Sequence, residues 1–298
     1  MSQNIIGVDI GGTTYSSTLF NNELNDIQKS KKELIADCPS TIFFLESLSE
    51  QILNLIKDSN KHNIKGVGIA CPGPLDSQNG IILETPNLKI LQNINLKREL
   101  ELLLNLPVHI ENDANLFALG EWFLNKGKNN EIFAGITLGT GLGFGIVING
   151  RMYLGAHGLS AEYAISPVDN GNWEDKVSIK AIKTITQKYI PNKDLSPEEL
   201  FLMASNGNNN AIKIWEDFGN NLGLALSHFI NLIDPHKISI GGGISNAFKF
   251  FNSSMLNTIK IYSPVYNNFN IKIFESDHKE LSAQIGAAVM VKDYYKKD

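Results

Sequence analysis

Two turns rich in glycine and threonine, 128 residues apart, carry the main chemical signal of this sequence. The first is Gly11-Gly12-Thr13-Thr14 and the second is Gly139-Thr140-Gly141, and each follows an apolar stretch typical of a strand. Glycine permits positive φ and has no Cβ, so consecutive backbone N–H groups can point at one spot, and threonine hydroxyls add donors. Such a spot binds phosphate, although a single turn of this kind can also merely close a β-hairpin. Two matched copies, one of them preceded by Asp9, favour a nucleotide.

Neither turn fits the two common nucleotide-binding motifs. No Gly-Lys-Ser/Thr follows either turn, which excludes a Walker loop. The sixth position of the dinucleotide-binding pattern is not glycine in either copy. The nucleotide hypothesis therefore rests on the duplication.

Two carboxylates could act beside these turns. Asp113 stands where an expected strand ends and an expected helix begins, between Asn112 and Asn115. Ligands gather beyond the carboxyl ends of strands in open α/β sheets, and a carboxylate there could accept the proton of an attacking hydroxyl. The alternative is that Asp113 caps the helix. Asp9 either bonds to the N–H groups of its turn or holds Mg²⁺ through water, and these two roles are compatible.

Two more glycine-rich stretches could bind a ligand. Gly241-Gly242-Gly243, between a strand and a helix, either lets an adenosine approach the backbone or forms a tight connection. The stretch from Gly155 to Glu162 is polar and rich in glycine, which makes Glu162 a candidate ligand residue; an exposed loop is the alternative.

The elements that must position these residues follow an α/β order. Hydrophobic periodicity, caps and turn residues predict strands at 5–10, 15–20, 27–35, 65–70, 80–84, 107–111, 237–240 and 271–274, a strand meander over 132–154, and helices after Ser40 and at 96–105, 113–126, 197–205, 211–233, 246–261 and 281–294. Both halves begin with strand, tight turn, strand, turn. A duplicated pair of α/β halves with mixed sheets, facing each other across a cleft, explains this order. We expect a first domain at 1–112, onto which a helix at 281–295 packs, and a second domain at 113–280.

Composition limits the possible classes of function. The 298 residues are 43% hydrophobic, as in a globular protein of two domains. A net charge of -5 argues against nucleic acid as the main partner. The two cysteines, Cys38 and Cys71, are too few for a disulfide scaffold and suit a reducing cytoplasm. No apolar run approaches the roughly 20 residues of a membrane span, and we expect neither a membrane partner nor a secretory leader.

Six motifs in order resemble those of the ROK family of bacterial sugar kinases over nearly the whole chain. They are Asp9-Ile10-Gly11-Gly12-Thr13, Cys71-Pro72-Gly73-Pro74, Thr85-Pro86-Asn87-Leu88, Glu111-Asn112-Asp113-Ala114-Asn115, Leu138-Gly139-Thr140-Gly141-Leu142-Gly143 and Gly241-Gly242-Gly243-Ile244. The resemblance implies the actin-like, ribonuclease-H-related fold of hexokinases, a hexose substrate, ATP and Mg²⁺. A homodimer is implied by the resemblance alone.

The resemblance also implies a role for each motif residue. Asp113 would be the catalytic base that activates a sugar hydroxyl. The two Gly/Thr turns, Gly11, Gly12, Thr13, Thr14 and Gly139, Thr140, Gly141, would cradle the ATP phosphates, and Gly242 and Gly243 would lie against adenosine. Gly73, Asn87, Asn112 and Glu162 would bond the sugar with Asp113, and Asp9 would position magnesium.

Two departures from the family pattern bear on zinc and on the sugar. Family members usually read Glu-x-Gly-His, whose histidine touches sugar and a structural zinc, where this chain has Glu162-Tyr163-Ala164-Ile165. The cysteine cluster of that zinc site is replaced by Asn170-Gly171-Asn172-Trp173, so we expect no zinc. An aliphatic side chain in place of an imidazole changes which sugar the pocket favours. Glucose, fructose and N-acylhexosamines remain alternatives.

The sequence therefore predicts an ATP-dependent, glucokinase-like hexose kinase. One rival is a sugar-responsive regulator of the same family, which would carry an N-terminal winged helix-turn-helix; the expected first strand at Asn4 leaves no room for it. The other is a catalytically silent sugar-binding sensor or an actin-like interaction protein.

Overall fold

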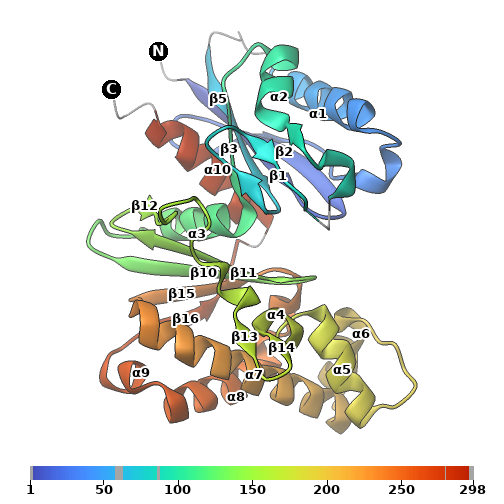
Figure 1. The fold of residues 1–298 in the computed structure, drawn as a ribbon, viewed down its shortest axis with the longest axis vertical. Helices are drawn as coiled ribbons and strands as arrows, with labels where there is room; N and C mark the ends of the chain where they lie inside the picture. The colour runs from blue at the N-terminus through green and yellow to red at the C-terminus, as the bar shows by residue number, and fades with distance from the viewer. Residues whose placement is uncertain (1–2, 58–62, 86–87, 279, 295–298) are drawn as a thin grey trace. The chain divides into compact units, whose positions relative to one another are not determined.

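The computed structural model describes residues 3–57, 63–85, 88–278 and 280–294. These residues form two compact units, shown in Figure 1. Unit 1 comprises Met1–Gly127, Arg151–Ser160 and Glu280–Asp298, and unit 2 comprises Lys128–Gly150 and Ala161–Lys279. Domains at 1–112 and 113–280 stay a prediction. None of the described helices is long and apolar enough to cross a membrane.

Unit 1 contains a mixed sheet. Its strands are β1 (Asn4–Ile10), β2 (Thr14–Phe20), β3 (Asp26–Lys29), β4 (Glu33–Leu34), β5 (Ile64–Cys71) and β9 (Val108–Asn112). The order is β3-β2-β1-β5-β9, with β4 paired to β2. β2 is antiparallel to β1, whereas β5 is parallel to both β1 and β9. The carboxyl ends of β1, β5 and β9 therefore lie at the same edge of the sheet.

Four helices cover this sheet. α1 (Thr41–Leu55) and α2 (Leu96–Leu104) pack on one face, and α3 (Asp113–Leu124) and α10 (Glu280–Tyr294) on the other (Figure 1). α10 lies so close to the strands that a Cβ on Gly68 would overlap the Ala287 carbonyl. α10 also crosses α3 closely, since a Cβ on Gly286 would overlap the Leu116 carbonyl. Glycine thus lets a helix from the end of the chain join the first sheet.

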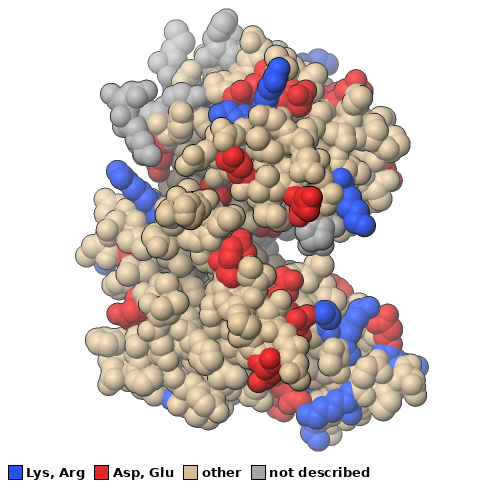
Figure 2. Space-filling view, in the orientation of Figure 1, with Lys and Arg blue, Asp and Glu red and all other residues tan. Residues whose placement is uncertain are grey.

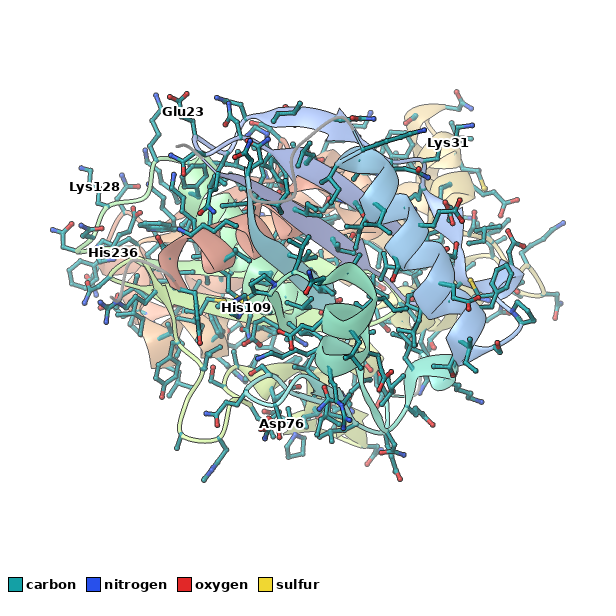
Figure 3. The ribbon with its side chains drawn as sticks, turned by 90° about the horizontal axis from the view of Figure 1, so that it is seen from above. Glu23, Lys31, Asp76, His109, Lys128 and His236 are labelled. Carbon is teal, nitrogen blue, oxygen red and sulfur yellow. The ribbon has the colours of Figure 1, made fainter. Side chains whose placement is uncertain are left out.

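A smaller three-stranded sheet completes unit 1. It consists of β6 (Leu75–Asp76), β7 (Ile81–Ile82) and β8 (Ile94–Asn95), and short 3₁₀ helices lie at Ile35–Asp37 (η1) and Lys89–Leu91 (η3). Asp76, labelled in Figure 3, accepts the backbone N–H of Asn79 at 3.1 Å and its side-chain amide at 2.8 Å, which closes the β6–β7 turn. The segment at 151–160 begins with β12 (Arg151–Met152).

Unit 2 repeats the strand–turn–strand unit of unit 1. β10 (Ile132–Leu138) and β11 (Leu142–Ile148) are antiparallel, and their bounds are those of β1 and β2 moved by 128 residues. β15 (Lys237–Gly241) lies parallel to β10 and to β16 (Lys272–Glu275), so the strands that belong to unit 2 have the order β11-β10-β15-β16. The predicted sequence repeat is therefore also a structural repeat.

Helices form the rest of unit 2. They are α4 (Trp173–Lys176), α5 (Ile179–Tyr189), α6 (Pro197–Ser205), α7 (Asn209–Ile233), α8 (Phe248–Tyr262) and α9 (Pro264–Asn268), with 3₁₀ helices at Glu162–Ile165 (η4) and Gly243–Ala247 (η5) and a strand pair β13 (Pro167–Val168) and β14 (Gly171–Asn172). α7 and α8 pack closely, because a Cβ on Gly223 would lie 2.5 Å from the Met255 carbonyl oxygen. Trp215, Phe218 and Phe251 are fully buried beside this crossing.

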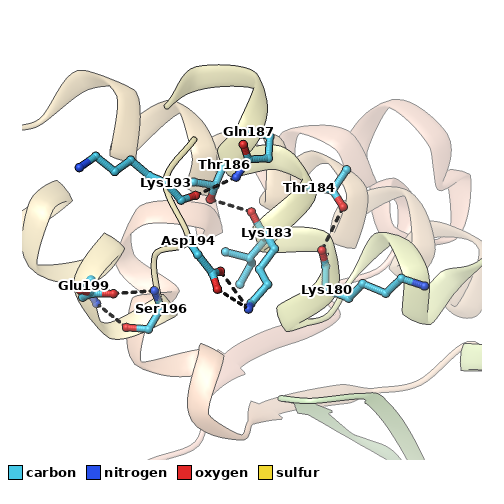
Figure 4. A network of polar contacts seen from close by, with 10 residues as sticks. Lys180, Lys183, Thr184, Thr186, Gln187, Lys193, Asp194, Ser196 and Glu199 are labelled. Atoms are coloured by element: carbon cyan, nitrogen blue, oxygen red, sulfur yellow. Dashed lines mark hydrogen bonds and ion pairs between the residues drawn. The ribbon is translucent and has the colours of Figure 1, made fainter. Parts of the chain in front are cut away.

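The connection between α5 and α6 confirms the predicted helix start (Figure 4). Ser196 accepts the N–H of Glu199, whose carboxylate accepts the Ser196 N–H at 2.8 Å, forming a capping box. Lys183 pairs with Asp194 at 2.9 Å. Figure 2 shows basic and acidic side chains side by side over these helices, as expected for a solvated face with weak ion pairs.

Candidate functional site

The carboxyl edge of the unit 1 sheet brings two of the predicted carboxylates together. Asp9 pairs in register with Ala70, and the next residue of β5, Cys71, pairs with Asn112. Burial raises the pKa of the fully buried Cys71 thiol, and the charges of Asp113 and Asp9 raise it further. Both carboxylates therefore lie near one buried thiol at the end of β5.

Asp113 is the first residue of α3, and the helix cap is its neighbour Asn112. The Asn112 side-chain oxygen accepts the N–H groups of Ala114 at 2.9 Å and Asn115 at 3.3 Å. One Asp113 oxygen accepts the Ala114 N–H at 2.8 Å. Burial raises the pKa of Asp113, against the opposing effect of that hydrogen bond. A carboxylate in this state is more basic than an exposed aspartate, which suits a proton acceptor.

Glu111 positions the residues around Asp113, a role that our reading of the sequence did not assign to it. Its side chain is 3% exposed. One of its oxygens accepts the Asn112 N–H at 2.8 Å and the Asn115 side-chain amide at 3.2 Å. Burial raises the pKa of Glu111. A carboxylate at the last buried position of a strand, followed by two asparagines, was the signal that could have identified it.

Gly73 also lies beside the start of α3. A Cβ on Gly73 would be 3.1 Å from the Asn112 side-chain nitrogen, and the Gly73 carbonyl accepts the Thr85 hydroxyl at 2.7 Å. Unit 1 thus brings together three of the predicted sugar ligands, Gly73, Asn112 and Asp113. Asn87 lies outside the described residues.

The remaining predicted sugar ligand, Glu162, belongs to unit 2. It opens η4 with an exposed side chain, directly after Ala161, whose φ is +62°. Ile165, at the position of the family histidine, is 63% exposed. The described residues contain no group of three or more His, Cys, Asp or Glu side chains that could hold a metal. In the segment that replaces the family's cysteine cluster, Asn172 caps α4.

The first Gly/Thr turn offers two consecutive backbone donors. The Gly11 N–H donates to the Thr14 carbonyl at 2.8 Å, and the Thr13 carbonyl accepts the Ile35 N–H at 2.8 Å. Within the described part of the chain, the N–H groups of Gly12 and Thr13 make no hydrogen bond. Such a pair of donors can bind an anion.

The second turn leaves the two equivalent donors open, with different internal hydrogen bonds. The Gly139 N–H donates to the Gly141 carbonyl at 3.0 Å, and the Gly139 carbonyl accepts the Ile179 N–H at 3.0 Å. The N–H groups of Thr140 and Gly141 have no partner among the residues that the structure describes. Glu174, which our reading of the sequence missed, accepts the Leu142 N–H at 3.1 Å. No local pattern marks Glu174, because it approaches the turn from a separate segment.

The expectation that these turns use positive φ is wrong. Among the described glycines with positive φ, none belongs to either turn. At Gly11, Gly139 and Gly141 the useful property of glycine is therefore the missing side chain. A Cβ on Gly139 would meet nothing within 4 Å, so this turn has open space beside its backbone.

Gly242 and Gly243 follow β15, next to the second turn. β15 pairs with β10 so that Gly241 lies opposite Thr137. Gly242 has φ +84°, and a Cβ there would overlap the Leu138 carbonyl. A Cβ on Gly243 would meet nothing within 4 Å. Unit 2 therefore places the second turn and a stretch of accessible backbone at one end of its sheet, where a nucleotide base and ribose could lie.

Known proteins resemble this chain over nearly its whole length. The family model described as "ROK family" matches residues 5–294. A glucokinase from Thermotoga maritima is 28% identical over 312 residues, which cover 97% of this chain and 97% of the relative. A xylose repressor from Caldicellulosiruptor bescii is 25% identical, over 96% of this chain and 77% of the repressor.

Solved structures share the fold. A ROK family glucokinase from Streptomyces griseus, in complex with glucose and AMPPNP, superposes with a TM-score of 0.83 at 22% identity, over 97% of this chain and 99% of that chain. This likeness confirms the predicted α/β fold of hexokinase type with two mixed sheets. Because the family model spans nearly the whole chain, the protein belongs to the ROK family.

Proposed function

We propose that this protein is an ATP-dependent hexose kinase in which Asp113 acts as the general base. The observation that carries the proposal is the state of Asp113: a partly buried carboxylate with a raised pKa at the carboxyl ends of the parallel strands β1, β5 and β9. Asp113 follows Asn112, whose side chain lies against Gly73. Asp113 would take the proton of a sugar hydroxyl as that oxygen attacks the γ-phosphoryl group of ATP. Gly73, Asn87, Asn112 and Glu162 would hold the sugar.

The two Gly/Thr turns would bind the ATP phosphates. Each turn has two neighbouring N–H groups that make no hydrogen bond to the residues the structure describes: Gly12 and Thr13 in unit 1, and Thr140 and Gly141 in unit 2. The hydroxyls of Thr13, Thr14 and Thr140 would add donors. Gly242 and Gly243 would lie against adenosine. The proposal requires one ATP to engage both turns, with water excluded so that the sugar hydroxyl attacks instead.

Asp9 fits a magnesium site of the kind that phosphoryl-transfer enzymes use. Mg²⁺ keeps several waters and binds through one or two carboxylates together with substrate phosphates. Asp9 is the penultimate residue of β1, two residues before Gly11 opens the first turn. When bound, the ion would neutralise phosphate charge, and Asp9 would hold it through water.

Glucose is the first sugar to test, because the Thermotoga maritima relative is a glucokinase. Ile165 in place of the family histidine keeps fructose and N-acylhexosamines as alternatives. A cytoplasmic location and a homodimer accompany the proposal as expectations. A second function is favoured by the similarity to a xylose repressor: a sugar-binding sensor or regulator without turnover.

A coupled assay for ADP release, with ATP, Mg²⁺ and a panel of hexoses and N-acylhexosamines, tests the proposal. We expect turnover with at least one sugar, and a loss of roughly 10²- to 10⁴-fold in kcat for Asp113→Asn with sugar binding retained. Asp277→Asn, at an exposed aspartate of unit 2, is the matched control and should leave turnover unchanged. Sugar binding by calorimetry without any turnover would instead support the sensor. Full turnover in Asp113→Asn would remove this residue from the base role.

A further inference from the structure

Glu174 contacts the second Gly/Thr turn from a segment outside the family motifs described above. One of its carboxylate oxygens accepts the Leu142 N–H at 3.1 Å. A Cβ on Gly141 would lie 2.5 Å from the same oxygen. The carboxylate therefore lies directly against the turn, and Gly141 provides the space for it.

A second hydrogen bond from the same part of the chain holds the other end of the turn. The Ile179 N–H, at the start of α5, donates to the Gly139 carbonyl at 3.0 Å. Between the two anchored positions lie Thr140 and Gly141, whose N–H groups have no partner in the part of the chain that the structure describes. The segment from Glu174 to Ile179 thus fixes the turn on both sides and leaves its two central donors open.

The first turn is also held by a backbone hydrogen bond from a separate segment, at a different position of the turn. There the Ile35 N–H, at the start of η1, donates to the Thr13 carbonyl at 2.8 Å. In both units, then, an isoleucine N–H that opens a helix holds a turn carbonyl. In the second copy, α4 also supplies a carboxylate, Glu174, which accepts the Leu142 N–H just after the turn.

The backbone of Glu174 is itself held in place by its neighbours. Asn172 accepts the Asp175 N–H at 2.9 Å, and Asp175 accepts the Asn172 N–H at 3.2 Å, so the short helix α4 starts with a capping box. Trp173 is 3% exposed, and its ring stacks on Tyr163. These contacts let Glu174 act as a rigid support.

We propose that Glu174 is a positioning residue that holds the Gly139–Gly141 turn in the shape that presents the Thr140 and Gly141 N–H groups to an ATP phosphate. The proposal rests on the ATP site proposed above. Glu174 can favour ATP binding only through its hydrogen-bond acceptor, because its negative charge repels a phosphate bound beside it. Glutamine keeps the acceptor and removes the charge, whereas alanine removes both.

Calorimetry of ATP binding to the full chain separates the effect of the hydrogen-bond acceptor from the effect of the charge. We expect Glu174→Gln to bind ATP within about threefold of the wild type, or more tightly, and Glu174→Ala to bind at least about tenfold more weakly. Sugar affinity should be unchanged in both. Glu216→Gln, at an exposed glutamate on α7, is the matched control for loss of charge in unit 2. Equal weakening in the glutamine and alanine variants would overturn the positioning role.

A double-mutant cycle tests the contact itself. Gly141→Ala should weaken ATP binding in the wild-type background, because the new methyl group meets the Glu174 carboxylate. The same substitution should cost less in the Glu174→Ala background, where that oxygen is gone. Additive effects would contradict the contact.

Hydrogen exchange of the 139–142 segment, without nucleotide, tests the bracing independently of ATP. We expect faster exchange in Glu174→Ala and wild-type exchange in Glu174→Gln. If the wild type does not bind ATP while this difference is present, the proposed function fails and the bracing stands. If exchange is the same in all three proteins, the bracing fails whatever the ATP result.

Discussion

At the scale of single residues, the unit 1 site keeps two carboxyl groups where ionisation is unfavourable. Burial raises the pKa of both Asp113 and Glu111. Their sequence positions differ by two, yet their contacts differ in kind: Glu111 is 3% exposed and bonded to Asn112 and Asn115, whereas Asp113 is half-buried and bonded to Ala114. This arrangement suits a pair in which Glu111 orients and Asp113 reacts.

The raised pKa of Asp113 predicts a stability gain on its neutralisation. A carboxyl group with a folded-state pKa above its unfolded value stabilises the fold below the unfolded pKa, and this contribution is lost as pH rises through the folded pKa. At pH 8 the ionised Asp113 therefore destabilises the protein, and Asp113→Asn should raise Tm, by roughly 2–4 °C for each kcal/mol gained. The gain should shrink as pH falls towards the ordinary aspartate pKa of 3.8.

Differential scanning fluorimetry between pH 4 and pH 8 measures this effect. Asp277→Asn, at an exposed aspartate, should follow the wild type at every pH. If the difference in Tm between Asp113→Asn and the wild type stays constant from pH 4 to pH 8, the ionisation of Asp113 does not limit stability.

At the scale of elements, local patterns predicted most of what positions the site. The strand–turn–strand pattern, repeated after 128 residues, predicted the β1–β2 and β10–β11 hairpins, and the Ser-Pro-Glu-Glu pattern predicted α6. Both predictions held because each hairpin and each helix cap is formed by residues close together in the sequence. The predicted strand over 27–35 was wrong: it is interrupted, with β3 ending at Lys29 and β4 starting at Glu33. The contacts of Glu174 with Leu142 could not be predicted, since they join segments that only the folded backbone brings together.

The junction after β15 offers a matched pair of substitutions. Gly242→Ala places a Cβ against the Leu138 carbonyl. The backbone there has φ +84° and ψ 169°, a region that almost only glycine adopts and that costs another residue roughly 1–3 kcal/mol. We expect Gly242→Ala to lower Tm. Gly243→Ala places its methyl group in open space, so Tm should stay near that of the wild type while ATP binding weakens.

Thermal unfolding and ATP calorimetry on both variants distinguish the two roles. The expected pattern is loss of stability at position 242 and loss of affinity with intact stability at position 243. Unchanged ATP affinity in Gly243→Ala would argue against adenosine lying on this backbone.

At the scale of the whole molecule, the described residues form two separate hydrophobic cores. One is formed by residues of unit 2 such as Trp215, Phe218 and Phe251, and the other by residues of unit 1 such as Ile6, Val8 and Phe44. Unit 1 is discontinuous, because α10 from the end of the chain packs on β1 and β5. The sequence analysis did not single out Gly68 and Gly286, the two glycines that permit the close approach of α10.

Separate cores predict that each unit can be destabilised without the other. Gly286→Ala puts a methyl group against the Leu116 carbonyl in unit 1, and Gly223→Ala puts one 2.5 Å from the Met255 carbonyl oxygen in unit 2. Overpacking of this kind costs roughly 1–3 kcal/mol. Hydrogen exchange measured by mass spectrometry should then show lower protection of β1 and β5 in Gly286→Ala, and of β10 and β15 in Gly223→Ala. Each variant is the control for the other, and equal loss of protection in all four strands in both variants would mean that the two units unfold as one.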